Sequence, residues 1–276
     1  KYGEQFKELF NSLNVDINLL QYDKESPTRI VKVLTDENGE RSFSGFKNSK
    51  NGIYADQMLN KEKIQQNNLY LDKLYINAQY IVVGTLLLAS RRSAEALSFL
   101  IKYSQKFDLK IVIDLNWRDI FWDNSEDSKH LKREDQLILI KNFLDYADIL
   151  KLAKEEAILL FGIVDPVSIS KSFPKSPDVI ITDGSNPIVW FINGLFDKND
   201  VIKSMQIVDS TGAGDAFLAA LVSQFLKYSP NMNRSVIKNM IQFASIAGFL
   251  NCLGEGAIEK QPTFNDIQKF LSGLGS

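Results

Sequence analysis

Apolar residues from about residue 79 onward alternate between short continuous runs and sets at helical spacing. Short apolar runs of this length are typical of buried strands, and a recurrence at three and four residues is typical of helices. The predicted elements are Tyr80–Val83, a helix containing Ala94, Leu97 and Ile101, Lys110–Asp114, 134–146, Ala147–Leu150, 154–161 closed by Gly162, and Asp178–Thr182. This alternation predicts an α/β fold, a mostly parallel doubly wound sheet with helices on both faces. Ligands of such sheets bind beyond the carboxyl ends of the strands.

Residues 29–46 break the alternation. They contain two strand-like runs, Arg29–Thr35 and Glu40–Phe46, joined by a turn at Asp36–Gly39. Because no helix separates the two runs, they cannot belong to the parallel core. We expect a small antiparallel β lid at about 27–50, whose open edges could pair with a second copy in a homodimer.

A second break follows at residues 187–208. Here we expect strands near Pro187–Ile192 and Ile202–Val208, joined by a polar turn. After Gly212 the pattern is helical, with helices predicted at about 213–228, 235–251 and 263–271.

Composition favours some classes of function over others. The 276 residues allow one large α/β domain or two small ones. The chain is 45% hydrophobic and 24% charged with a net charge of −2, which favours neither nucleic acid nor a membrane as partner. No apolar run reaches membrane-spanning length. The one cysteine, Cys252, permits no intrachain disulfide, and the one histidine, His130, lies in a polar stretch as a solvated residue would. We expect a cytoplasmic protein.

Residues 208–217 are the most informative segment. The strand predicted to end at Val208 is followed by small residues, by Asp215, and by the apolar run Ala216–Val222 of a buried helix. The first N–H groups of a helix have no internal partner, and the helix dipole adds positive charge there. Gly212 and Gly214 would let the backbone approach a ligand closely. The segment therefore predicts a cradle for a phosphate.

Asp215 at this cradle has two interpretations. It is either a helix-start acid favoured by the dipole, or a general base that takes a proton from an attacking hydroxyl during phosphoryl transfer. The Gly-Ala-Gly run fits a dinucleotide fingerprint poorly because a third glycine is missing, and the P-loop pattern is absent.

The run Asp209-Ser-Thr-Gly-Ala-Gly-Asp-Ala-Phe217 resembles the C-terminal motif of the ribokinase/PfkB carbohydrate kinases, in particular the fructokinase-like members. The similarity implies a single domain over 1–276 with the ribokinase-like three-layer αβα sandwich. It implies that Asp215 is the catalytic base and that the amides of Gly212, Ala213, Gly214 and Asp215 form an anion hole. It also places a monovalent cation such as K⁺ near Asp209 and Thr211.

Further segments are similar to the same family. Asp114-Leu-Asn-Trp-Arg118 resembles its Asp-x-Asn-x-Arg motif, so Asn116 and Arg118 would face the substrate and phosphates; a structural Arg118 paired with Asp114 or Asp119 is the alternative. By the same resemblance Thr182, Gly184, Thr211 and Gly256 would bind ATP. Phe43 and Phe46 of the lid would meet the sugar, or else pack in a dimer interface or in the lid's own core.

Two departures from the family pattern stand out. The Asn-x-x-Glu motif linked to Mg²⁺ corresponds to Ala153-Lys-Glu-Glu156, so Glu156 remains as a ligand through water while the Asn is an Ala. The family's opening strand, with its sugar-binding Asp, and the Gly-Gly-x-x-x-Asn motif are not found, because Tyr2-Gly3-Glu4 resembles the helix after both. We expect the N-terminal strand and first motifs to be missing from this chain.

The resemblance implies an ATP-dependent, Mg²⁺-assisted sugar kinase that acts on fructose or a related ketose or keto-sugar acid. A nucleoside kinase of the same fold is one alternative. A non-catalytic binding or regulatory protein is another, favoured by Ala153 and opposed by the presence of Asp215 and Arg118.

Overall fold

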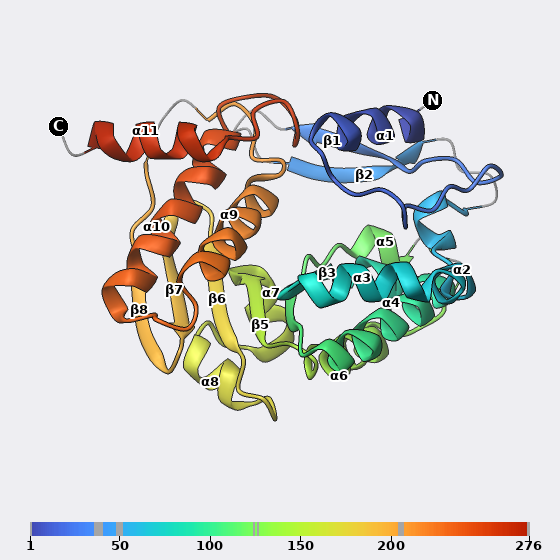
Figure 1. The fold of residues 1–276 in the computed structure, drawn as a ribbon, viewed down its shortest axis with the longest axis horizontal. Helices are drawn as coiled ribbons and strands as arrows, with labels where there is room; N and C mark the ends of the chain where they lie inside the picture. Colours follow the sequence, from blue (N-terminus) through green and yellow to red (C-terminus); the bar gives the residue numbers. More distant parts are fainter. Residues whose placement is uncertain are drawn as a thin grey trace. The chain divides into compact units, whose positions relative to one another are not determined.

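The computed structural model describes residues 2–35, 41–47, 52–123, 125, 127–203 and 207–274. The chain divides into two compact units. Unit 1 comprises Lys1–Ile111 and Asn116–Tyr146, and unit 2 comprises Val112–Leu115 and Ala147–Ser276. A two-stranded sheet has the order β1-β2, and a six-stranded sheet has the order β3-β4-β5-β6-β7-β8 (Figure 1). The predicted α/β class is confirmed, with a mixed main sheet and a small antiparallel one.

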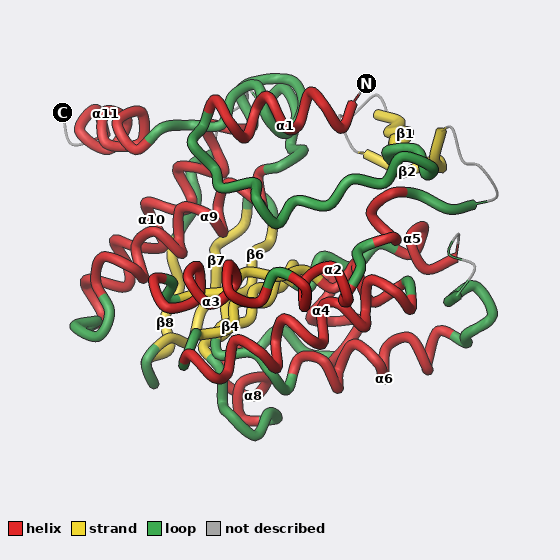
Figure 2. Tube along the Cα trace, turned by 45° about the vertical axis from the view of Figure 1, so that its right-hand side comes forward, coloured by secondary structure: helices red, strands yellow, loops and turns green. Residues whose placement is uncertain are grey.

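Unit 1 contains the hairpin and most of the N-terminal helices. Its elements are α1 (Tyr2–Ser12), β1 (Ile30–Thr35), β2 (Arg41–Lys47), η1 (Ala55–Met58), α2 (Lys61–Gln66), α3 (Asn68–Asn77), β3 (Tyr80–Gly84), η2 (Thr85–Ala89), α4 (Arg91–Ser104), η3 (Gln105–Phe107), the start of β4 (Lys110–Asp114), α5 (Asp119–Asp123) and α6 (Arg133–Leu144). The predicted hairpin is confirmed, since β1 and β2 pair antiparallel (Figure 2). Its predicted turn at 36–39 lies outside the described residues.

Helix α4 of unit 1 buries one apolar face. In α4, Ala96, Leu97 and Ile101 are fully buried at the spacing that places them on one face. Ala96 packs in one cluster with Ile64 of α2 and Leu71 of α3. The core of unit 1 thus joins helices that follow one another along the chain.

Unit 2 holds the parallel strands and the C-terminal helices. Its elements are the end of β4, β5 (Ile149–Ala153), α7 (Lys154–Phe161), α8 (Pro166–Lys171), β6 (Asp178–Asp183), β7 (Asn186–Ile192), β8 (Leu195–Asn199), α9 (Ala213–Tyr228), α10 (Arg234–Asn251) and α11 (Phe264–Leu274). β5 pairs parallel with both β4 and β6. Successive residues Ile149–Leu152 of β5 are all buried. Because neighbouring side chains of a strand point to opposite faces, both faces of the sheet are covered here.

One strand lies elsewhere than predicted. Of the strand predicted at Ile202–Val208, residues 204–206 lie outside the described residues, and the described residues 202, 203, 207 and 208 are not in a strand. The partner of β7 is instead β8 (Leu195–Asn199), which pairs antiparallel after a turn at Asn193–Gly194. β8 alternates half-buried and exposed positions, and its half-buried positions include the polar residues Asp197 and Asn199, so it lacks the continuous apolar run on which the prediction depended.

The packing of α9 against α10 fixes where α9 begins (Figure 1). A Cβ at Gly248 of α10 would lie 3.0 Å from the carbonyl oxygen of Ala213 and 3.6 Å from Cβ of Phe217. A glycine at this position therefore lets α10 approach the first turn of α9. The start of α9 is thus held by a helix that follows it in the sequence.

Candidate active site

The turn that opens α9 depends on Gly212. This residue is the N-cap of α9 with φ 80°, a left-handed conformation that side chains disfavour. A Cβ here would lie 2.8 Å from both Cα and Cβ of Ala257. Gly212 is thus required both by its backbone conformation and by the close approach of the 254–257 loop.

Asp209 joins the same two loops. Its Oδ1 accepts the N–H of Thr211 at 2.6 Å, and its Oδ2 accepts the N–H of Gly256 at 2.8 Å. From α10, the fully buried Asn251 donates from Nδ2 to the carbonyl oxygen of Thr211 at 2.7 Å. These hydrogen bonds therefore hold four predicted residues close together, with Asp209, Thr211 and Gly212 in one turn and Gly256 in the adjacent loop.

The first turn of α9 offers free backbone donors beside an exposed carboxylate. Within the described part of the chain, the N–H groups of Gly214 and Asp215 have no acceptor. The N–H of Ala213 donates to the carbonyl oxygen of Ser210 at 3.2 Å. The Asp215 side chain belongs to an exposed residue, while Ala216, Phe217 and Leu218 after it are buried. This arrangement can hold an anion against the helix N-terminus and can accept a proton next to it.

A buried ion pair lies against this turn. Lys151 of β5 and Asp114 at the end of β4 are 3.1 Å apart, Nζ to Oδ1, with side chains 9% and 10% exposed. A Cβ at Gly214 would lie 3.1 Å from the Nζ of Lys151. The ammonium group thus reaches the first turn of α9 from the adjacent strand.

The carboxyl ends of β5 and β6 carry the other residues predicted to bind the nucleotide or metal. Ala153 and Thr182 are paired across these strands. Glu156 is buried and accepts the N–H of Ala153 at 2.7 Å from the first turn of α7. Thr182 donates from Oγ1 to the carbonyl oxygen of Leu152 at 3.3 Å.

The turn after β6 contains a further ion pair. Lys154 donates to Asp183 at 2.8 Å, and this hydrogen bond raises the pKa of Lys154. The next residue, Gly184, has φ 52° in the turn between β6 and β7. Lys154 therefore keeps its positive charge at the strand end where Thr182 and Gly184 lie.

Asn116 and Arg118 belong to unit 1. Asn116 has a left-handed φ of 46°, and Arg118 donates from Nη1 to the carbonyl oxygen of Trp117 at 2.6 Å. Asp119, one alternative partner of Arg118, accepts from Trp117 Nε1 at 2.8 Å and lies 3.1 Å from Arg133 Nη1. The indole of Trp117 in turn stacks on that of Trp122. The segment is thus fixed by its tryptophans.

Arg29 lies at the root of the lid in unit 1, where Phe46 of β2 packs on other rings. Its guanidinium carbon lies 4.5 Å from the centroid of Phe46, 4.3 Å from that of Tyr54 and 4.6 Å from that of Phe121. Arg29 also donates from Nε and Nη2 to the carboxylate of Asp56. Phe46 therefore packs on residues outside its own hairpin, namely Tyr54 at the start of η1 and Phe121 of α5. The side chain of Phe43 lies outside the described residues.

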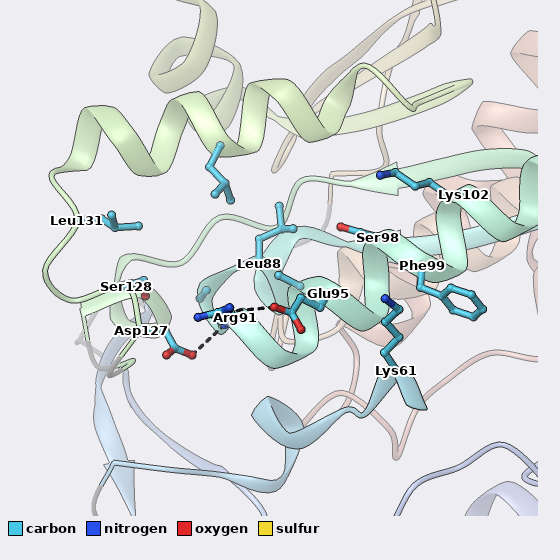
Figure 3. Close-up of a pocket in the computed structure, with 13 residues that line it drawn as sticks. Lys61, Leu88, Arg91, Glu95, Ser98, Phe99, Lys102, Asp127, Ser128 and Leu131 are labelled. Carbon is cyan, nitrogen blue, oxygen red and sulfur yellow. Dashed lines mark hydrogen bonds and ion pairs between the residues drawn. The ribbon is translucent and has the colours of Figure 1, made fainter. Parts of the chain in front are cut away.

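A separate pocket of about 510 Å³ opens in unit 1 between α4, α6 and the loop before α6 (Figure 3). Its charged lining includes Arg91, which pairs with Glu95, and Asp127, whose carboxylate accepts the N–H of Arg91. None of the residues predicted to bind substrate or nucleotide lines this pocket. It therefore adds nothing to the predicted site.

Two site features were missed from the sequence. Lys151 could have been found, because a lysine inside the run Ile-Leu-Lys-Leu at 149–152 is a charge in an otherwise buried strand. Asn251 gave no signal, since an amide near a helix end is common. Among the described residues, no group of three or more His, Cys, Asp or Glu side chains could hold a metal ion. None of the described helices combines the length and apolar character needed to cross a bilayer.

The α/β fold and the backbone donors beside the Asp215 carboxylate fit a phosphotransferase. The sequence matches the family described as "pfkB family carbohydrate kinase" over residues 1–264, and the chain belongs to this family. It is thus a carbohydrate kinase, a phosphotransferase with an alcohol group as acceptor.

Known relatives support the fructokinase-like subgroup. A fructokinase of Vibrio alginolyticus is 25% identical over 278 residues, which cover 98% of this chain and 82% of the relative. A fructokinase structure from Xylella fastidiosa with bound ATP has a TM-score of 0.82 at 21% identity, covering 99% of this chain and 82% of that one. The fructokinase of Vibrio cholerae O395 in its fructose-, ADP- and calcium-bound form has a TM-score of 0.75 at 20% identity, covering 98% of this chain and 82% of that one. These structures confirm the ribokinase-like fold.

Proposed function

We propose that this protein transfers the γ-phosphoryl group of ATP to a hydroxyl of fructose or of a related ketose or keto-sugar acid. The observation that carries the proposal is the start of α9, where the N–H groups of Gly214 and Asp215, which have no acceptor among the described residues, adjoin the exposed residue Asp215. The fructokinase relative, and the ATP and fructose in the two related structures, support ATP as donor and fructose as acceptor.

In this proposal Asp215 takes the proton of the attacking hydroxyl. The N–H groups of Gly212, Gly214 and Asp215 hold the phosphoryl oxygens, and Ala213 contributes only if its bond to Ser210 gives way. Phosphoryl transfer demands mainly positioning and stabilisation of charge, which an amide cradle at a helix N-terminus can supply.

The remaining predicted residues have supporting roles in the proposal. Arg118 adds positive charge toward the phosphates, and Asn116 and Phe43 contact the sugar. Thr182, Gly184, Thr211 and Gly256 contact the nucleotide.

Mg²⁺ bound with the nucleotide would neutralise phosphate charge. The residues present fit this ion, because Mg²⁺ takes most of its ligands from water and phosphate and needs only one or two carboxylates. Glu156, which lies in the first turn of α7 at the carboxyl end of β5, would hold it through water. K⁺ near Asp209 stays a prediction, as do a cytoplasmic location and a homodimer through the lid.

The test compares Asp215→Ala with Asp135→Ala. Asp135 is an exposed acid in the first turn of α6. Its removal therefore costs the same favourable interaction with a helix dipole but touches no residue of the proposed site. With ATP and Mg²⁺, we expect the wild-type protein to phosphorylate fructose. We expect Asp215→Ala to lower kcat by roughly 10²–10⁴-fold, the usual contribution of a general base, and Asp135→Ala to keep wild-type turnover.

The acceptor panel should include a ketose, a keto-sugar acid and a ribonucleoside. Turnover that persists in Asp215→Ala would refute its assignment as base. A wild-type protein that favours the ribonucleoside would indicate the nucleoside kinase instead. Binding of ATP without phosphorylation of any acceptor would favour a regulatory protein.

A further inference from the structure

Lys151 occupies a place that a lysine rarely occupies. It lies in the middle of β5, where Ile149, Leu150 and Leu152 are at most 2% exposed, and its own side chain is only 9% exposed. Burial of an ammonium group is unfavourable unless it is paired, and even a paired charge is often no better for stability than an apolar residue of similar size. The position therefore requires an explanation other than stability.

The orientation of the ion pair supplies one. The Nζ of Lys151 lies 3.1 Å from the point where a Cβ of Gly214 would be. Among the described residues, no other atom from outside the local chain lies within 4 Å of that point, so the carboxylate of Asp114 is farther away. The positive end of the pair thus lies nearer the first turn of α9 than the negative end, which belongs to Asp114 of β4.

The sign of this charge matches that of the turn. The N-terminus of α9 already carries partial positive charge from the helix dipole. An ammonium group held against Gly214 adds to it in surroundings from which water is largely excluded, where charge acts more strongly than in water. A side chain at Gly214 would displace the ammonium, which gives this glycine a role beyond access for a ligand.

We propose that Lys151 is an electrostatic positioning residue for phosphoryl transfer, which strengthens the hold of the α9 cradle on the γ-phosphoryl group of a nucleoside triphosphate. This inference rests on the proposed function. Asp114 holds the ammonium in place and orients it toward Gly214. Lys151 neither gives nor takes a proton in the reaction.

The competing explanation is that the pair only fills space between β4 and β5. The variant Lys151→Met alone cannot separate the two, because it removes one member of the buried ion pair and keeps the Asp114 carboxylate in place. The double variant Lys151→Met/Asp114→Leu can, since it replaces the pair by apolar side chains of similar size. A matched control is Lys175→Met/Asp148→Leu, which removes a pair of the same 3.1 Å separation whose side chains are 38% and 31% exposed.

We expect Lys151→Met to lower Tm and the double variant to recover most of that loss. We expect kcat of the double variant with ATP and fructose to stay at least about tenfold below wild type, as for loss of electrostatic stabilisation at a reaction centre. Asp114→Asn, whose amide oxygen can still accept from Lys151, should lose less activity than Lys151→Met. Recovery of wild-type kcat in the double variant, or an equal loss in Asp114→Asn, would overturn the proposal.

Binding provides a readout that needs no sugar. The Kd values for ATP and ADP, measured by calorimetry, give the preference of the protein for the γ-phosphate. We expect the Lys151→Met/Asp114→Leu variant to lose about tenfold of this preference and the Lys175→Met/Asp148→Leu control to keep it. If wild type lacks the preference, the proposed function fails and this inference fails with it. If wild type has it and the Lys151 double variant keeps it, only the inference is wrong.

Discussion

Arg29 in unit 1 and Lys151 in unit 2 are both nearly buried cations paired with a carboxylate, but their surroundings differ. Arg29 is 8% exposed and its partner Asp56 is 43% exposed, so one end of that pair is hydrated. Lys151 and Asp114 are both about as buried as Arg29. Three aromatic rings surround Arg29, whereas the Lys151 ammonium faces the turn that opens α9.

The difference shows what each cation does. A guanidinium among aromatic faces gains cation–π attraction and packing. Here Arg29 contacts one ring each from β2, from the start of η1 and from α5. An ammonium against a helix N-terminus gains nothing from that contact, because charges of like sign meet there. We therefore interpret Arg29 as a structural residue at the root of the lid, and Lys151 as a residue kept for its effect on a bound anion.

The largest expected loss of stability and activity comes from a substitution in the turn that opens α9, on the Lys151 side of this comparison. Gly212→Ala should lower the free energy of unfolding by about 2–4 kcal/mol, from strain at positive φ and from overpacking against Ala257. Activity should fall by roughly 100-fold or more, because the free amides move. Urea denaturation and steady-state kinetics measure the two effects.

Gly162→Ala is the control for this change. Gly162 ends α7 with φ 70°, but no atom lies within 4 Å of its Cβ position among the described residues. We expect a loss of about 1 kcal/mol from strain alone, with kcat unchanged. A loss in Gly212→Ala no greater than in Gly162→Ala would show that the approach of Ala257 does not constrain the turn.

A smaller effect is expected at the root of the lid. Arg29→Met should lower the free energy of unfolding by about 2–3 kcal/mol, because it removes charge-assisted hydrogen bonds and cation–π contacts while Asp56 stays hydrated. Arg91→Met is the matched control, since Arg91 is 83% exposed in an i,i+4 pair with Glu95. It should change stability by less than about 0.5 kcal/mol. Equal urea midpoints for the two variants would contradict a structural role for Arg29.

The smallest expected change in stability concerns Tyr75, a buried residue of unit 1 with a polar hydroxyl group. Within the described residues its hydroxyl has no hydrogen-bond partner, and burial raises its pKa to about 12. Between pH 10 and 12 the unfolded chain releases this proton while the folded chain keeps it, so stability falls as pH rises through this window. The Tyr75→Phe variant should therefore lose roughly 1–2 kcal/mol less free energy of unfolding than wild type over this window, a figure already reduced for solvent screening.

Denaturation at pH 8, 10.5 and 12 checks this expectation. Tyr75→Phe should equal or exceed wild-type stability at pH 8, because an unsatisfied buried hydroxyl is lost. Parallel pH dependences in the two proteins would refute the assignment of the fall to Tyr75.

Local signals explain which elements were predictable. The predicted bounds of β4, α7 and α9 agree with the structure. β4 has a continuous apolar run, and a glycine marks one end of each helix, Gly162 after α7 and Gly212 before α9. β8 was misplaced because an exposed edge strand carries few apolar residues. The β1–β2 hairpin was predicted, but neither of the two alternative partners for Phe46, a dimer interface or the hairpin itself, includes its contacts with Tyr54 and Phe121.

The site was predictable to the same extent. Gly212, Gly214 and Asp215 are adjacent in the sequence, so the cradle they form follows from local backbone geometry. The partners that hold it come from elsewhere, namely Asp209 bonding to Gly256 and Asn251 bonding to Thr211. Such pairs carry no periodicity or spacing from which they could be predicted.

The sequence alone determined the alternation of strands and helices, the antiparallel lid and the start of a buried helix at Ala213, because each depends on neighbouring residues. Only the tertiary structure decided that Lys151 would meet Gly214 and that Arg29 would meet Phe121. Those contacts arise when strands pair and helices pack, which brings together residues far apart in the chain and sets the charge around the cradle.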